Sequence, residues 1–127
     1  MIADNVLADK TLDFAIRIVK CCQYLQSEKK EFVMSKQIVR SGTSIGANVF
    51  EAIYAQSKAD FVSKLSVSLK EASETSFWLL VLNKTDYIDQ KVYSSMRGDL
   101  DEIIRILISS IKTTRKNEKY SNESVEQ

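Results

Sequence analysis

Residues 37–52 read QIVRSGTSIGANVFEA, and the spacing of their apolar and small side chains decides the fold class. One line of such residues recurs every three or four positions, which is the period of one face of an α-helix. The line extends back by one turn and consists of Met34, Ile38, Ser41, Ile45, Asn48 and Ala52. Because Ser41, Gly42 and Gly46 are small, a second helix can approach this one closely. The stretch therefore predicts an amphipathic helix over about residues 32–55, with its tightest contact to the helix that follows it.

The same period appears in three further segments, over about residues 9–27, 58–83 and 90–116. In the first of these the main line is Leu12, Ala15, Ile16, Val19 and Cys22, widened by Phe14, Ile18, Cys21 and Leu25. The chain of 127 residues has no proline and three glycines, so turn signals are rare and long helices are favoured over a sheet. Ser57 and Asp89 are expected to cap the last two helices. We predict an all-α fold, an antiparallel up-and-down four-helix bundle over residues 1–116.

Composition excludes several kinds of active site. The chain has no histidine, which removes Ser-His and Cys-His nucleophile pairs and histidine-containing metal sites. Cys21 and Cys22 are neighbours, and we interpret them as reduced packing residues. With 18 basic and 17 acidic side chains, the formal charge of +1 gives no strong attraction to nucleic acid or to an anionic membrane. No signal peptide and no apolar run of about 20 residues is visible, so a cytoplasmic protein without membrane contact or cofactor is expected.

The C-terminal end of the chain and the first connection are polar. Residues 117–127 lack periodicity and are expected to form a disordered tail. Basic side chains around the start of this tail either oppose a helix dipole or contact nucleic acid: Lys112, Arg115, Lys116 and Lys119. The charged run at residues 28–31 is expected to be a solvated turn.

A second apolar side appears on two of the predicted helices. It consists of Val39, Thr43, Phe50, Ile53 and Tyr54 on the second helix and of Phe77 and Trp78 on the third. A helix that is apolar on both sides is normally buried on both sides, which a lone four-helix bundle does not provide. These residues therefore predict an interface between copies of the chain. The alternative is that the bundle covers more of these two helices than a helical projection suggests.

Polar residues gather along the remaining edges of the same two helices. The group consists of Arg40, Asn48, Glu51, Lys64, Glu71 and Glu74. We interpret them as a polar network that fixes helix register, within one subunit or between subunits, with Asn48 as a buried register-setting amide. Glu71 and Glu74 have the spacing of paired metal ligands, but no histidine or nucleophile accompanies them. We predict no catalytic residues and no metal site.

The middle of the chain resembles a known family. Residues 37–52, followed by SKADFVSKLSVSLKEASETSFWLLVL, are similar to the four-helix-bundle proteins encoded in intervening sequences of bacterial large-subunit (23S) ribosomal RNA genes. The shared features are Arg40-Ser41, Ser44-Ile45, Asn48, Glu51-Ala52, Ser57-Lys58, Asp60-Phe61, Lys64-Leu65, Glu71, Glu74 and Trp78-Leu79.

This resemblance implies a left-handed up-and-down bundle that assembles into homo-oligomeric rings, notably pentamers. It implies no enzymatic activity. A related branch, the accessory proteins of diversity-generating retroelements, binds nucleic acid and partners a reverse transcriptase. Members of that branch are markedly basic, whereas this chain is nearly neutral.

Three functions remain open on the sequence. The first is a homo-oligomeric scaffold that engages structured RNA, DNA or a nucleic-acid-binding protein, with phosphate contacts expected from Lys29, Lys30, Lys36 and Arg40. The second is an inert ring whose polar helix edges face a central channel. The third is a small enzyme or metal protein that uses Glu51, Glu71 and Glu74.

Overall fold

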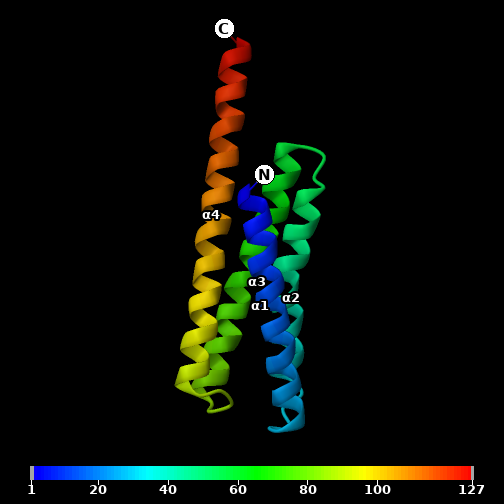
Figure 1. Cartoon of the computed structure of the whole chain (residues 1–127), viewed down its shortest axis with the longest axis vertical. Coiled ribbons are helices and arrows are strands. Elements are labelled where there is room, and N and C mark those ends of the chain that lie inside the picture. Colours follow the sequence, from blue (N-terminus) through cyan, green and yellow to red (C-terminus); the bar gives the residue numbers. More distant parts are fainter. Residues whose placement is uncertain (1, 127) are drawn as a thin grey trace.

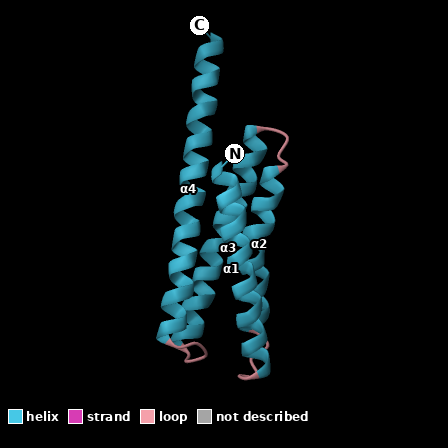
Figure 2. Cartoon of the chain, viewed as in Figure 1, coloured by secondary structure: helices cyan, strands magenta, loops and turns pink. Residues whose placement is uncertain are grey.

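The computed structural model describes residues 2–126 as four helices joined by short loops (Figure 1). They are α1 (Ile2–Ser27), α2 (Met34–Ile53), α3 (Lys58–Lys84) and α4 (Gln90–Glu126). Successive helices run in opposite directions, and Figure 2 shows helix and loop but no strand in the part of the chain that is described. Each helix packs against the next along the chain, and α1 closes the bundle against α4. The all-helical, four-helix prediction is confirmed.

The two middle helices begin and end close to the predicted positions, but the two outer helices are longer. Helix α1 already includes Leu7 and Ala8, which are buried in the core and hold this first part of the helix against the bundle. Helix α4 continues through residues 117–126, where the sequence predicted a disordered tail. No glycine or proline follows Gly98, so nothing in the sequence stops the helix. Its C-terminal part extends past the other three helices (Figure 1).

Apolar side chains from all four helices form one core. Its fully buried members include Phe14, Ile18 and Leu25 from α1, Ile38 and Ile45 from α2, Leu65, Leu79 and Leu82 from α3, and Met96, Leu100 and Ile103 from α4. On α1 the predicted line is therefore wrong except at Cys22, which is buried. Leu12, Ile16 and Val19 are exposed, and the residues that were expected only to widen the line face the core. Both lines have helical spacing, so periodicity alone did not say which one the bundle covers.

The predicted caps of α3 and α4 are confirmed. The Ser57 hydroxyl accepts a hydrogen bond from the Asp60 amide over 3.0 Å, and the Asp60 carboxylate accepts one from the Gln56 amide over 3.3 Å. At the start of α4, a carboxylate oxygen of Asp89 accepts from the Val92 amide over 2.8 Å. These bonds satisfy amides that have no partner inside the helix.

Helix α2 has its most extensive contact with α3, as predicted, but Gly42 and Gly46, which the sequence placed at this contact, face α1 instead. Small polar side chains lie between the two helices. The Ser68 hydroxyl donates to the Ile45 carbonyl over 2.8 Å, and the Thr75 hydroxyl lies 2.9 Å from the Ser41 hydroxyl. All three side chains are fully buried. These two contacts therefore fix the register of α2 against α3.

Candidate protein–protein interface

An apolar hollow lies on the surface between α1 and α2. It measures about 230 Å³ and is lined by Leu12, Ala15, Thr43, Gly46, Ala47 and Phe50. A second hollow continues along α1 over Ala15, Ile16, Val19, Lys20 and Gln23. We call the residues of α1 and α2 that line these two hollows, apart from Lys20 and Gln23, the α1–α2 apolar face. They are Leu12, Ala15, Ile16 and Val19 on α1 and Thr43, Gly46, Ala47 and Phe50 on α2. Its members recur every three to four residues on each helix, on the side away from the core.

The predicted interface residues of α2 belong to this face or adjoin it. Phe50 is 46% exposed and Tyr54 is 84% exposed, and Ile53 is exposed as well. Val39 and Thr43 are half-buried, and the Thr43 hydroxyl donates to the Val39 carbonyl over 2.6 Å within the helix. The sequence did not predict the contribution of α1, because Leu12 and Ile16 had been assigned to the core.

The predicted interface residues of α3 lie elsewhere. Phe77 is 56% exposed and stands edge-on to Trp78, with ring centroids 5.2 Å apart. Trp78 is half-buried, and its indole Nε1 has no acceptor among the described residues. We call Phe77 and Trp78 the α3 patch. Helices α1 and α3 do not contact each other, so the α3 patch and the α1–α2 apolar face are two separate surfaces.

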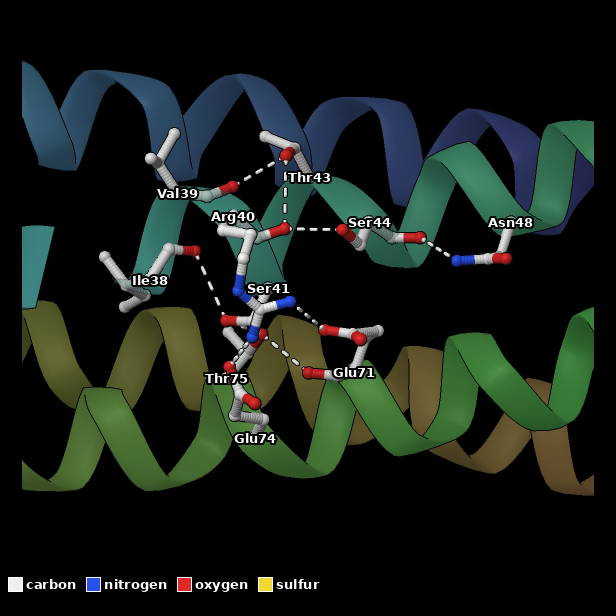
Figure 3. Close-up of polar contacts among 10 residues, drawn as sticks. All are labelled: Ile38, Val39, Arg40, Ser41, Thr43, Ser44, Asn48, Glu71, Glu74 and Thr75. Carbon is white, nitrogen blue, oxygen red and sulfur yellow. Dashed lines mark hydrogen bonds and ion pairs between the residues drawn. The ribbon is translucent and has the colours of Figure 1, made fainter. Parts of the chain in front are cut away.

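A polar seam runs along the edge where α2 meets α3 (Figure 3). Arg40 donates to Glu71 over 3.2 Å and also to Glu74, so one guanidinium joins two carboxylates that lie one turn apart. Farther along, Lys64 pairs with Glu51 over 3.3 Å. The predicted polar residues therefore pair with each other inside one chain. These contacts are partly exposed and contribute little to stability individually.

Asn48 lies beside this seam but bonds within its own helix. Its side-chain amide donates to the Ser44 carbonyl over 2.8 Å, and the side chain is half-buried (Figure 3). The buried polar contacts between α2 and α3 are thus made by Ser41, Ser68 and Thr75. Asn48, which was predicted to make such a contact, does not.

The four candidate nucleic-acid contacts do not form one group. Lys29, Lys30 and Lys36 are exposed at the turn between α1 and α2, where Lys30 adopts a positive φ of 54°. Arg40 lies farther along α2, and its charge is offset by Glu71 and Glu74. Of these four residues, Lys29, Lys30 and Lys36 have no ion pair with a described side chain.

Glu31, in the same turn, has a structural role that the sequence did not reveal. Its buried carboxylate accepts hydrogen bonds from the amides of Val33, Met34 and Ser35, which are the first free amides of α2. Burial opposes the negative charge, but the hydrogen bonds from Ser35, Met34 and Val33 outweigh it and place the pKa of Glu31 below its ordinary value. The sequence predicts a solvated turn here, and for Glu31 this prediction is wrong. The turn holds the start of α2 through this one acidic side chain.

A polar cleft separates α1 from α4. Lys10 pairs with Glu102 and Arg17 pairs with Asp99, each over 2.7 Å, and Arg17 also donates to the Ser95 hydroxyl over 2.9 Å. The hollow between these pairs measures about 270 Å³, and Phe14 and Ile103 lie beneath it. Four of the five charged side chains that line the cleft thus have partners on the facing helix, and the fifth, Asp13, has no ion pair with a described side chain.

The described residues contain no group of three or more histidine, cysteine, aspartate or glutamate side chains placed to hold a metal ion. Glu51, Glu71 and Glu74 are occupied by Lys64 and Arg40. Among the same residues, no helix combines the length and the apolar character needed to cross a bilayer.

Known proteins are similar to this chain along most of its length. The family model described as 23S rRNA-intervening sequence protein matches residues 3–109. A crystal structure at 1.70 Å resolution, of a protein with unknown function from the S23 ribosomal protein family of Bacteroides thetaiotaomicron, has a TM-score of 0.86 and 57% sequence identity. The match covers 87% of this chain and 98% of that one. A search of curated proteins found no match.

Proposed function

This chain belongs to the 23S rRNA-intervening sequence protein family, and we propose that it acts as a non-catalytic scaffold built from several copies of itself. The observation that supports this proposal is the α1–α2 apolar face. Leu12 is 47% exposed and Phe50 is 46% exposed, and they border one hollow together. A continuous apolar surface of this kind is typical of protein–protein interfaces.

Two unlike apolar surfaces favour a ring. If the α1–α2 apolar face of one copy packs against the α3 patch of the next, each copy uses two different surfaces. Such head-to-tail contacts generate a closed ring when the rotation between neighbours closes. The pentamer implied by the family resemblance is one such ring.

The pairing of the charged groups supports a non-catalytic role. Catalytic acids and bases need a free functional group facing a pocket. Here the carboxylates of Glu71 and Glu74 face Arg40, and that of Glu31 faces backbone amides. In the α1–α4 cleft, Lys10 pairs with Glu102 and Arg17 with Asp99.

A second candidate function is a cytoplasmic adaptor for nucleic acid or for a nucleic-acid-binding protein, as in the related retroelement branch. The observation that favours it is the group of exposed lysines at the α1–α2 turn, Lys29, Lys30 and Lys36. The alternative is an assembly that is purely structural or has a protein partner.

The mass of the protein in solution tests the scaffold proposal. Sedimentation equilibrium of the wild type should give several times the chain mass of 14.4 kDa. Ile16→Glu should dissociate the assembly, because it places a charge in the α1–α2 apolar face. Val92→Glu is the matched control, since Val92 is an exposed apolar residue of α4 outside both surfaces. A wild-type protein that sediments as a monomer at micromolar concentration would contradict the proposal.

A further inference from the structure

Helix α4 carries a stretch that contains cations and no acidic residue. Residues 103–117 read IIRILISSIKTTRKN and include Arg105, Lys112, Arg115 and Lys116. All four of these side chains are exposed. None of them has an ion pair with a side chain that the structure describes, in contrast to Lys10, Arg17 and Arg97, which each bind a carboxylate.

Three of the four cations point in nearly the same direction. At about 100° per residue, Arg105, Lys112 and Lys116 fall within about 40° of each other. Ile103, Leu107 and Ile111 occupy the other side of the helix and are buried in the core. We call Arg105, Lys112 and Lys116 the α4 cation row. At ~1.5 Å per residue, Arg105 and Lys116, the two ends of the row, lie roughly 16 Å apart along the helix. The row is therefore longer than the ~12 Å width of a DNA major groove.

The C-terminal half of this row lies where α4 leaves the bundle. Helix α4 runs on past the neighbouring helices toward Glu126 (Figure 1). Lys112, Arg115 and Lys116 also lie beyond residues 3–109, the range that the family model matches. Two of the three residues of the row therefore lie outside the range that the family model matches, and Arg105 lies inside it.

We propose that the α4 cation row binds the phosphate backbone of a nucleic acid. Phosphate contacts from lysine and arginine provide the sequence-independent part of nucleic-acid affinity, and a row of exposed cations on one side of a helix offers several of them at once. The exposed hydroxyls of Ser109 and Thr113 lie beside the row and add further donors.

The composition of the segment separates this partner from a membrane. A helix that lies on a bilayer presents an apolar face to the lipid. Within residues 103–111 the apolar side chains are covered by the bundle at least in part, except Ile108, which is 37% exposed, and residues 112–117, KTTRKN, have no apolar side chain. The exposed cations can therefore bind a polyanion through electrostatic contacts alone. Nucleic acid is a polyanion whose phosphates are regularly spaced.

This inference rests on the nucleic-acid version of the proposed function and assigns its contact to α4 instead of the α1–α2 turn. The experiment compares two variants of the full chain that each lose three positive charges. One is Arg105→Gln/Lys112→Gln/Lys116→Gln, and the other is Lys29→Gln/Lys30→Gln/Lys36→Gln. Fluorescence anisotropy measures their affinity for a labelled RNA hairpin and for a DNA duplex between ~50 mM and ~200 mM salt. Circular dichroism checks that both variants keep the helical fold.

The α4 variant should bind at least about ten-fold more weakly than the wild type, with a salt dependence reduced by about two phosphate contacts. The turn variant should stay within about two-fold of the wild type. Equal losses in both variants, or a loss confined to the turn variant, would overturn the α4 assignment and leave an adaptor function intact. Absence of wild-type binding to both probes at ~50 mM salt would overturn it as well, and sedimentation would still report on the scaffold independently.

Discussion

Gly42 of α2 lies so close to Ile18 of α1 that a β-carbon at Gly42 would stand 2.8 Å from both Cγ atoms of Ile18. Ile18 is fully buried, so it has no room to move aside. One turn farther, a β-carbon at Gly46 would lie 3.3 Å from the Thr11 carbonyl oxygen. The two glycines therefore set the distance between α1 and α2. That distance brings Leu12 and Phe50 to the two sides of one hollow, which forms the α1–α2 apolar face.

Gly42→Ala should destabilise the protein. Alanine at an exposed helix position is better than glycine by about 1 kcal/mol, but overpacking against Ile18 costs about 1–3 kcal/mol. Gly98→Ala is the control, because nothing lies within 4 Å of a β-carbon there, and it should raise stability by about 0.5–1 kcal/mol. Urea denaturation of the two variants measures the difference. Equal stabilisation by both substitutions would mean that α1 and α2 are not held this closely.

Glu31→Gln should weaken the start of α2. The substitution removes the negative charge of the carboxylate that accepts hydrogen bonds from the amides of Val33, Met34 and Ser35. The loss of such a helix cap lowers the free energy of unfolding by about 0.5–2 kcal/mol at neutral pH. The pKa of Glu31 is lower in the folded protein than in the unfolded chain. Its contribution to the free energy of unfolding is therefore complete above the unfolded-state pKa of about 4.3, and it is lost as the pH falls through the folded-state pKa. The wild type and the variant should therefore converge in stability as the pH falls below the folded-state pKa of Glu31. Glu28→Gln, at an exposed neighbour, should leave stability nearly unchanged, and a Glu31→Gln variant that behaved in the same way would argue against the cap.

Thr75→Val should cost about 1 kcal/mol, because it removes a buried hydrogen bond to Ser41. The double variant Ser41→Ala/Thr75→Val replaces both partners by apolar groups and should cost less than the sum of the two single changes. Thermal or urea unfolding of the wild type, both single variants and the double variant gives the coupling free energy. Strict additivity would show that the two hydroxyls do not interact across the α2–α3 contact.

Cys21 should react slowly with thiol reagents in the folded protein. Burial raises the pKa of its thiol to about 11, and the neighbouring Cys22 adds to this effect. The thiol is therefore protonated at neutral pH, and only the thiolate is nucleophilic. Mass spectrometry after iodoacetamide treatment should find little modification at neutral pH until denaturant is added. Rapid labelling of the folded protein would contradict the packing role of this residue.

The features that the sequence predicted correctly are local. The line through Ile38, Ser41 and Ile45 and the caps at Ser57 and Asp89 depend on residues a few positions apart. On α1, by contrast, the lines through Phe14 and through Leu12 are equally periodic. The choice between them depends on where Gly42 lets α1 approach α2, which is a contact between distant parts of the chain.

The same distinction applies to the charged residues. The sequence grouped Arg40, Glu71 and Glu74 as a polar network but left their partners open. Their pairing depends on the register of α2 against α3, which the buried contacts of Ser41 and Ser68 fix. Glu31 escaped prediction because glutamate is not among the residues that usually cap a helix, and its place in the charged run 28–31 indicated a solvated turn.

A mixing experiment tests the head-to-tail assembly most directly. Ile16→Glu disables the α1–α2 apolar face, and Phe77→Glu disables the α3 patch. Sedimentation equilibrium should give a larger assembly for the wild type, a monomer for each variant alone, and a one-to-one heterodimer for the equimolar mixture, in which one intact surface of each kind remains. A wild-type monomer, or a Phe77→Glu protein that still self-associates while Ile16→Glu does not, would contradict the head-to-tail contact.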